Sequence, residues 1–173
     1  MSTTNHRRER GYRWEKSIVD FFNDRKLFED WHAKRLGGTS TELPDILITN
    51  NKLSILYSVE AKSTTGNLAY IHNDQICRCM DILGMFSIYR KRYVVFAFKF
   101  AKSKCNPRLV YYFFRVLPKF SLRDVKTIRC DNTGKINMIK MNGEYMVKLE
   151  FMRHDHIKFL RDLWSVQPMD FIL

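Results

Sequence analysis

Two apolar stretches joined by a short polar turn constrain the fold of this chain most strongly. The stretches lie within residues 46–49 and 53–61, and the turn between them is Asn50-Asn51-Lys52. Nearly continuous apolar runs are typical of strands that are buried on both faces, and asparagine is favoured in tight turns. We therefore expect two adjacent antiparallel strands inside a sheet that is covered on both sides.

Helical and strand patterns alternate along the rest of the chain. Apolar residues recur at helical spacing within residues 8–27, and a second helix, capped by Asn73, is expected to run to about residue 90. Further strands are expected near residues 30–35, 93–100, 109–116, 136–140 and 145–151, and a closing helix at residues 154–164. This order predicts an α/β fold in which a mixed β-sheet is flanked by helices.

Length and composition favour one folded domain with a full core. The chain has 173 residues, of which 45% are hydrophobic and 14% aromatic, and a disordered chain would be poorer in both classes. We expect a single domain over residues 1–173, with its core at about residues 8–117. A C-terminal extension of about residues 118–173 is expected to pack on this core.

No segment is expected to cross a membrane or to direct secretion. The apolar run at residues 93–98 is flanked by Arg92 and Lys99, and a spanning helix needs about 20 apolar residues. The N-terminus is charged and no apolar stretch follows it, which argues against a signal peptide. The four cysteines fit neither a CxxC pair nor a dense disulfide framework. A reduced, cytoplasmic protein is therefore expected.

The positive charge is concentrated in about a third of the chain. The net charge is +12, and residues 90–140 hold fourteen Lys or Arg against only Asp124 and Asp131, so that the remainder is balanced. Such a segment suits a polyanion because each neutralised phosphate releases bound counterions. Nucleic acid, either DNA or RNA, is the expected partner. The alternative is that these cations solvate the outer face of a sheet.

Three charged residues at the ends of the central strand pair are candidates for chemistry. Asp45 opens the first strand, and Glu60 and Lys62 end the second, where they share one face because strand side chains alternate. Two carboxylates that face each other would make an oxygen-rich site for Mg²⁺. A lysine beside them would orient or help deprotonate an attacking water and offset the charge of a phosphate.

Simple pairing across the turn sets the expected geometry of this group. It puts Asp45 opposite a residue near Tyr57, so that Glu60 lies about three residues, roughly 10 Å, further along the strand. Splaying or a bulge is then needed to bring both carboxylates onto one ion. The alternative interpretation is that all three charged residues belong to a sheet surface, although burial beside apolar runs costs free energy unless such groups pair or bind metal.

Several motifs together resemble a known family of nucleases over about residues 8–100. Pro44-Asp45 followed by Glu60-Ala61-Lys62 resembles the signature of PD-(D/E)xK nucleases. The segment from Arg10 to Glu15 resembles the Arg-Gly-x-x-x-Glu motif of archaeal Holliday junction resolvases, and Gly-Gly-Thr-Ser, ending at Ser40, resembles their serine-bearing loop. Further matches to the spacing of that family are Ser63, Tyr70 and Gln75.

The resemblance implies a restriction-endonuclease-like core with a metal site. Asp45 and Glu60 would ligate Mg²⁺, for which Mn²⁺ is expected to substitute, and Lys62 would be the catalytic lysine. Glu15 would complete the acidic site as a catalytic residue and metal ligand. Ala61 would add a further metal ligand through its main chain.

The resemblance also implies contacts with DNA. Ser40 would act as a catalytic residue at the scissile phosphate, with Thr39 and Thr41 as alternative hydroxyls. Arg10 would bind backbone phosphate. The further candidates for nucleic-acid binding are Arg13, Arg35, Tyr70 and Gln75.

The activity implied by the resemblance is Mg²⁺-dependent, structure-selective cleavage of DNA. The expected enzyme is a homodimer that binds branched DNA and resolves four-way junctions by paired nicks. A sliding clamp is a further candidate partner. The alternatives are a restriction-type or other structure-specific nuclease of the same superfamily, and a non-catalytic nucleic-acid-binding protein.

Overall fold

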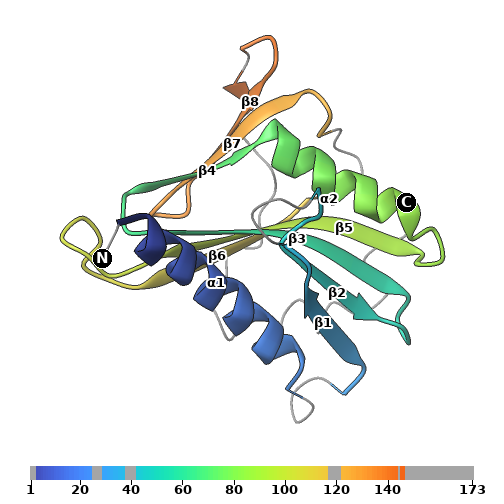
Figure 1. Ribbon diagram of the computed structural model, residues 1–173. Helices are drawn as coiled ribbons and strands as arrows, with labels where there is room; N and C mark the ends of the chain where they lie inside the picture. Colours follow the sequence, from blue (N-terminus) through green and yellow to red (C-terminus); the bar gives the residue numbers. More distant parts are fainter. Residues whose placement is uncertain (1–2, 25–28, 38–41, 117–121, 144, 147–173) are drawn as a thin grey trace.

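The computed structural model describes residues 3–24, 29–37, 42–116, 122–143 and 145–146. In this part of the chain, two helices and two β-sheets form three layers (Figure 1). The first layer is helix α1 (Thr3–Phe22), the second is a five-stranded sheet, and the third is helix α2 (Asn73–Met85) beside a four-stranded sheet. The predicted α/β class, with a mixed sheet flanked by helices, is confirmed.

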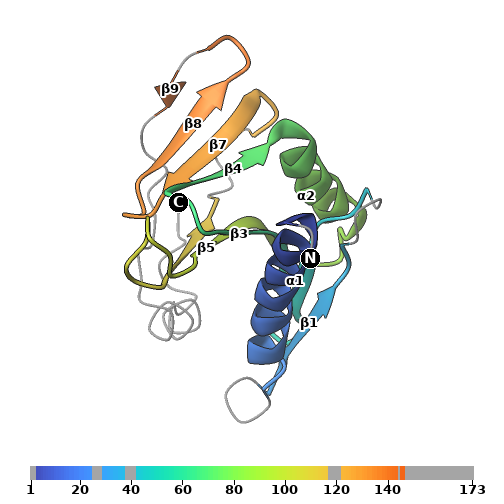
Figure 2. The ribbon, with the colours of Figure 1, turned by 60° about the vertical axis from the view of Figure 1, so that its left-hand side comes forward.

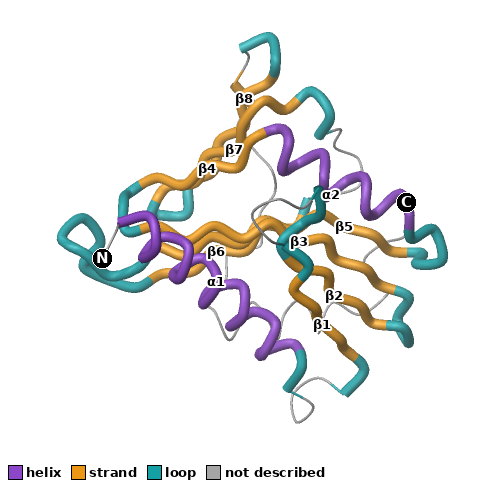
Figure 3. Tube along the Cα trace, in the orientation of Figure 1, coloured by secondary structure: helices purple, strands orange, loops and turns teal. Residues whose placement is uncertain are grey.

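The five-stranded sheet is the centre of the fold (Figure 3). Its strands are β1 (Trp31–Arg35), β2 (Ile46–Asn50), β3 (Ile55–Thr64), β5 (Lys91–Phe100) and β6 (Val110–Arg115). They are arranged in the order β1-β2-β3-β5-β6, with β3 and β5 parallel and all other neighbours antiparallel. A parallel pair needs a crossover connection, which here contains α2.

A second sheet lies beside α2 on the same side of the first sheet (Figure 2). Its strands, in spatial order, are β4 (Leu68–His72), β7 (Val125–Asp131), β8 (Ile136–Lys140) and β9 (Tyr145–Met146), all antiparallel. The sequence did not predict β4 and β7, because buried positions alternate with exposed or half-buried ones along both strands and leave no apolar run. Along the chain, β4 follows β3 after three residues and leads directly into α2.

Side chains of β5 alternate between two hydrophobic cores, which explains why this strand is apolar almost throughout. Val95 and Ala97 pack with Trp14 of α1 in one core. Phe96 and Phe98 pack against α2 and the second sheet in the other core. The central sheet is therefore covered on both faces, as its apolar runs predict.

Helix α1 begins and ends earlier than predicted. It covers Thr3–Phe22 rather than residues 8–27. Directly after it, Asn23 pairs with Ala33 of β1: its Nδ2 donates to Ala33 O at 2.9 Å, and its Oδ1 accepts from Ala33 N at 2.8 Å. These two hydrogen bonds tie the end of the helix to the edge of the sheet.

Helix α2 also differs from its predicted bounds. Its N-cap is His72 rather than Asn73, whose Nδ2 instead donates to Val125 O of β7 at 2.8 Å. It ends at Met85 rather than near residue 90, where the main chain is already bound to the turn between β2 and β3. The start of the helix is thus attached to the second sheet and the segment after it to the first.

Some predicted features lie outside the described residues. The strand predicted at residues 145–151 is described only as β9, and the closing helix predicted at residues 154–164 falls outside. The single domain with an extension from about residue 118 stays a prediction, although β4 and β7 pair across that boundary. None of the described helices combines the length and the apolar character that crossing a bilayer requires.

A glycine in the turn between β7 and β8 allows a contact that a side chain would destroy. Gly134 has φ +82°, and a Cβ on it would lie 2.6 Å from a ring atom of Tyr112. We expect Gly134→Ala to lower the free energy of unfolding by about 2–5 kcal/mol, because overpacking adds to the strain of a left-handed backbone. The matched control is Gly143→Ala, since Gly143 has φ +86° and no neighbouring atom within 4 Å. Urea denaturation should show a loss of only about 1–2 kcal/mol for the control, and equal losses would contradict the packing argument.

Candidate active site

The register of β2 and β3 brings two predicted acids together. Ile46 pairs with Val59, so in this antiparallel register the preceding residue, Asp45, lies opposite Glu60. The main-chain N of Ala61 donates to Asp45 Oδ2 at 2.8 Å. The expectation that Asp45 faces Tyr57 is therefore wrong, and neither splaying nor a bulge is needed to bring the two carboxylates close.

The predicted register fails because the turn is longer than expected. Strand β2 ends at Asn50 and β3 begins at Ile55, so four residues connect them. Ser54 adopts φ 54° in the left-handed region, and Asn50 Oδ1 accepts a hydrogen bond from Leu53 N at 2.8 Å. The longer turn shifts the partner of every residue in β2 by three positions along β3.

The loop after β1 holds Asp45 from the other side. Leu36 N and Gly37 N both donate to Asp45 O, at 2.9 and 3.2 Å. A Cβ on Gly37 would lie 3.0 Å from both Cα and Oδ1 of Asp45, which is closer than side chains normally pack. Glycine at this position therefore lets the loop pass directly against the carboxylate.

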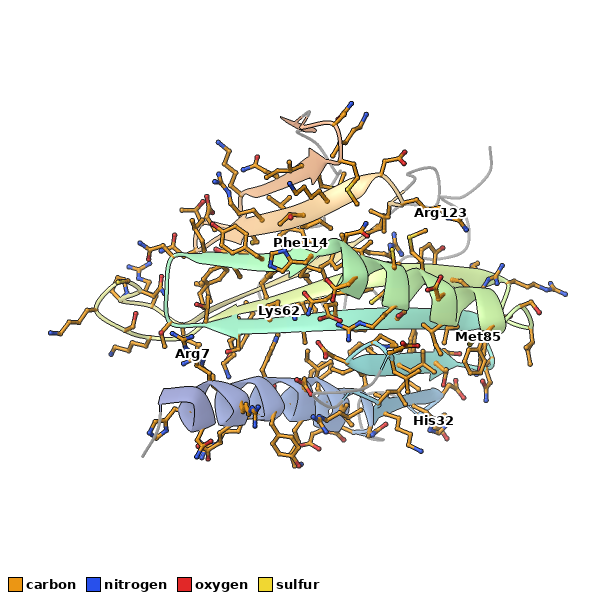
Figure 4. The ribbon with its side chains drawn as sticks, turned by 45° about the horizontal axis from the view of Figure 1, so that its top comes forward. Arg7, His32, Lys62, Met85, Phe114 and Arg123 are labelled. Carbon is orange, nitrogen blue, oxygen red and sulfur yellow. The ribbon has the colours of Figure 1, made fainter. Side chains whose placement is uncertain are left out.

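Glu60 is a buried carboxylate beside two cations. Its exposed fraction is 0%, Lys62 Nζ donates to its Oε1 at 2.7 Å, and Arg78 Nη2 of α2 lies 4.0 Å from the same oxygen. Burial raises the pKa of Glu60 to about 7, with a further increase from the charge of Asp45, while Lys62 and Arg78 oppose the shift. The other oxygen, Oε2, is buried without a hydrogen-bond partner among the described residues. Figure 4 shows Lys62 on β3, with α1 below and α2 above.

Glu15 of α1 reaches the same region but is held by an arginine. Arg35 Nε donates to Glu15 Oε2 at 2.5 Å, and the Arg35 guanidinium lies 4.9 Å from the centre of the Tyr12 ring. Burial raises the pKa of Glu15, the hydrogen bond from Arg35 lowers it, and the charge of Asp45 raises it again. Lys62 also lowers this pKa. Glu15 therefore interacts electrostatically with both Asp45 and Lys62.

A cleft of about 530 Å³ opens between α1 and α2. The residues that line it come from the two helices, the end of β1 and the loop before β2, and they are Arg8, Glu9, Gly11, Tyr12, Glu15, Arg35, Gly37, Asp45, Gln75 and Arg78. Three of these residues are arginines and three are acids, so the charge of the lining is balanced, unlike that of the whole chain. Asp45 lines this cleft and also lies opposite Glu60, so the ion pair of Glu60 and Lys62 is next to the cleft.

Three other predicted residues have different surroundings. Gln75 lines the cleft, and its Oε1 accepts a hydrogen bond from His72 N at 3.2 Å where α2 begins. Arg13 forms an exposed ion pair with Glu9 and is not among the described residues that line the cleft. Arg10 is half-buried, and its Nε has no hydrogen-bond partner in the described part of the chain.

Two more predicted positions lie away from the carboxylates or outside the description. Tyr70 is 42% exposed on β4 and does not belong to the described lining of the cleft. Ser40, with its alternatives Thr39 and Thr41, lies outside the described residues. The structure thus brings together Glu15, Asp45, Glu60 and Lys62 from the predicted set.

Two arginines of the cleft were not predicted. Arg8 and Arg78 both line it, one from each helix. Helical spacing could have found them: Arg8 lies seven residues before Glu15, and Arg78 lies three residues after Gln75, so each pair shares a face of its helix. The signal is visible only once the cleft-facing side of each helix is known.

Two carboxylates of the described residues, those of Asp45 and Glu60, are placed so that they could bind one metal ion. No group of three or more His, Cys, Asp or Glu side chains in the described chain is arranged to hold one. Mg²⁺, however, is usually bound by one or two carboxylates together with waters and substrate phosphate. Asp45 and Glu60 fit such an ion, because a cation would offset the burial of Glu60, the repulsion between the two acids and the missing partner of Glu60 Oε2.

The burial of Glu60 makes stability depend on pH. Its pKa of about 7 in the folded protein lies above the ordinary value of 4.5, so the folded state binds this proton more tightly than the unfolded state does. Without divalent metal, we expect the free energy of unfolding to lose about 3 kcal/mol from this group as the pH rises from about 4.5 to about 7.

Urea denaturation over this pH range measures the effect. Glu60→Gln should remove this part of the pH dependence, whereas Asp20→Asn, at an exposed position on α1, should retain it. A Glu60→Gln profile that runs parallel to that of the unchanged protein would contradict the assignment.

Comparison with known proteins finds similarity to solved structures but to no protein family or curated sequence. No protein-family model matches the sequence, and no curated protein sequence matches it. The structure of Hjc from Archaeoglobus fulgidus, a Holliday junction resolvase from an archaeal hyperthermophile, is similar over 71% of this chain and 84% of its own chain, with 19% sequence identity and a TM-score of 0.45. A likeness of this degree does not assign an activity.

Proposed function

We propose that this chain is a metal-dependent nuclease that hydrolyses phosphodiester bonds in DNA. The main support is that Asp45, Glu60 and Lys62 lie together where β3 extends past the start of β2, with Ala61 N bonded to Asp45 and Lys62 bonded to Glu60. Two carboxylates and a lysine beside an arginine-containing cleft are suited to holding a divalent cation against a phosphodiester.

Each residue of this group has a task that fits its position. Asp45, Glu60 and the main-chain oxygen of Ala61 would hold Mg²⁺. When bound, Mg²⁺ would act as a Lewis acid that makes water more acidic and offsets the charge of the scissile phosphate. Lys62 Nζ, 2.7 Å from Glu60 Oε1, would orient the attacking water and neutralise charge that develops on the phosphate oxygens. In-line attack on phosphorus would leave a 5′-phosphate and a 3′-hydroxyl.

Arginines from both helices would bind the DNA strand in the cleft. Arg8 and Arg78 approach the cleft from α1 and α2, and arginine–phosphate hydrogen bonds are strong and directional. Arg35 is paired with Glu15 in the described structure. If a phosphate drew Arg35 away, Glu15 would become available to the metal site. Ser40 would contact the scissile phosphate.

We infer branched DNA as the substrate from the motifs that accompany the carboxylates. The segment from Arg10 to Glu15 and the match at Gln75 resemble archaeal Holliday junction resolvases, which nick two opposed strands of a four-way junction. Two coordinated nicks need two sites, so a symmetric homodimer is proposed as well.

A different nuclease of the same superfamily is the second candidate because of the second sheet. Strands β7, β8 and β9 lie beyond the stretch that resembles the resolvases, and they add a surface next to α2. Such a surface would change which shape of DNA fits beside the cleft. A purely binding function has less support, since burying Glu60 near Asp45 costs stability that binding alone does not require.

Cleavage of a synthetic four-way junction in Mg²⁺ tests the proposed chemistry. Asp45→Asn should lower the rate by about 10²–10⁴-fold, because the amide keeps the shape of the side chain but loses the charge that holds the cation. Binding of the junction should be largely retained. Asp20→Asn, an exposed change on α1, should leave the rate unchanged. Cleavage that survives EDTA, or that Asp45→Asn retains, would reject the mechanism.

Competition between the junction and a linear duplex of the same sequence separates the candidate activities. Preferential cutting of the junction supports a resolvase, whereas equal cutting supports another nuclease of the superfamily. Tight binding without cleavage in either Mg²⁺ or Mn²⁺ would leave only a binding function. Sedimentation velocity of the free protein tests the homodimer.

A further inference from the structure

Three loops meet at the end of β3 around one buried asparagine. The loops are residues 65–67, 101–109 and 131–135, the last of which starts with the final residue of β7, and Asn106 at their centre is only 2% exposed. Asn106 Nδ2 donates to Thr65 O at 2.9 Å and to Gly66 O at 2.7 Å. Its Oδ1 accepts from Asn132 Nδ2 at 2.8 Å. A single side chain therefore links loops from both sheets.

Further hydrogen bonds hold the same three loops together. Ser103 Oγ donates to Thr65 O at 2.7 Å, and Asn132 N donates to Asn67 O at 3.0 Å. Tyr112 of β6 donates through its hydroxyl to Asn132 O at 3.0 Å. The loops are thus held by one buried side chain and by hydrogen bonds to one another, which reduces the entropy that would be lost when they bind a partner.

The three hydrogen-bonded loops carry several exposed cations. The exposed residues Lys102, Lys104, Arg108 and Lys135 project from them, and we call this set the loop platform. Loops 65–67 and 101–109 contain no acid. In the third loop, Asp131 Oδ1 accepts hydrogen bonds from Thr133 N, Thr133 Oγ1 and Lys135 N, so its carboxylate is engaged within the turn.

The loop platform lies within reach of DNA bound at the cleft. Thr64, the last residue of β3, is four residues beyond Glu60, which corresponds to about 13 Å along a strand. That distance is about four base pairs of duplex, at about 3.4 Å each. Figure 4 shows Arg7 of α1 at this same end of the sheet. A duplex with one phosphate in the cleft would thus extend past further cations.

We propose that the loop platform binds the phosphate backbone of a duplex arm outside the cleft. The inference rests on the proposed function, because it takes DNA with its scissile phosphate in the cleft as the ligand. Exposed cations on loops that are held in place suit phosphates, whose neutralisation releases counterions, and the one acid in these loops, Asp131, is already engaged by hydrogen bonds within its own turn. The alternative, simple solvation of a loop, would not require a buried asparagine to fix its shape.

Binding without metal tests the inference independently of cleavage. The double variant Lys102→Ala/Lys104→Ala is titrated, in EDTA, against a fluorescent duplex of about 30 base pairs, or three helical turns, and against a junction with equal arms. If both lysines contact phosphates, the slope of log K against log salt should become shallower by about 1.8, and affinity near 0.1 M salt should fall by roughly 60-fold. Adding Arg108→Ala should bring the change in slope to about 2.7.

The matched control removes the same charge at the other end of β5. Arg90→Ala/Lys91→Ala also deletes two cations. Arg90 precedes β5 and Lys91 is its first residue, whereas Lys102 and Lys104 follow its last residue. We expect this control to keep nearly the affinity and salt slope of the unchanged protein. Equal losses in the two double variants would show a general charge effect and overturn the inference.

Asn106→Ala tests whether the hydrogen bonds that hold the loops matter for binding, because it keeps every cation. Circular dichroism and thermal denaturation first establish that the variant is folded. Its affinity for duplex should then fall by about tenfold, because the loops must be ordered on binding. Unchanged affinity in a folded Asn106→Ala variant would contradict the role given to these hydrogen bonds, and the Lys102→Ala/Lys104→Ala variant keeps the inference testable if Asn106→Ala unfolds.

Failure of this inference and failure of the proposed function give different results. A protein that cuts DNA normally but whose loop-platform variants bind like the unchanged protein refutes only the inference. A protein that cuts no DNA in Mg²⁺ or Mn²⁺, yet binds duplex through the loop platform, refutes the proposed function and supports the inference. Absence of DNA binding in the unchanged protein refutes both.

Discussion

The hydrogen bond from Ala61 N to Asp45 Oδ2 is the interaction on which the site depends. It joins the start of β2 to β3 at the point where the two strands stop pairing, and it brings the Asp45 carboxylate to the Glu60 side of the sheet. Gly37 completes the arrangement, because a side chain at this position would crowd Asp45 where the loop after β1 approaches it. The register behind this contact is set at the opposite end of the strand pair, by the four-residue turn. A local feature of one turn therefore determines whether two acids meet.

The electrostatics of the molecule separate two requirements that would otherwise conflict. A strongly positive cleft would attract nucleic acid but repel a divalent cation, and a strongly acidic cleft would do the reverse. Here the cleft carries equal numbers of arginines and acids, while the excess of positive charge lies in residues 90–140. Lys62 and Arg78 oppose the penalty of burying Glu60 without fully removing it. The buried site is thus locally balanced within a chain whose excess of positive charge lies in another segment.

Much of the central sheet could be predicted from the sequence, because strands buried on both faces leave a strong apolar signal. This holds for β2, β3, β5 and β6, whose positions agree with the prediction to within a few residues. Strands β4 and β7 gave no such signal, since one face of each carries polar or exposed residues. Asp45, Glu60 and Lys62 were found from residue type and spacing, whereas Glu15 was a candidate only through the resemblance of its segment to a known motif. Arg8 and Arg78 were not, because recognising them requires knowing how the two helices lie across the cleft.

The path of the chain between Lys62 and Gln75 determines how separable the parts of this protein are. That path runs through β4, which belongs by sequence to the part that resembles a nuclease but pairs in the described sheet with β7. A truncation after residue 116 would remove that neighbour and uncover part of the face of β5 that carries Phe96 and Phe98. It would also remove the acceptor of the hydrogen bond from Asn73 at the start of α2. The C-terminal strands are therefore not a detachable module: an engineered minimal version would lose the anchorage of the helix that brings Arg78 to Glu60.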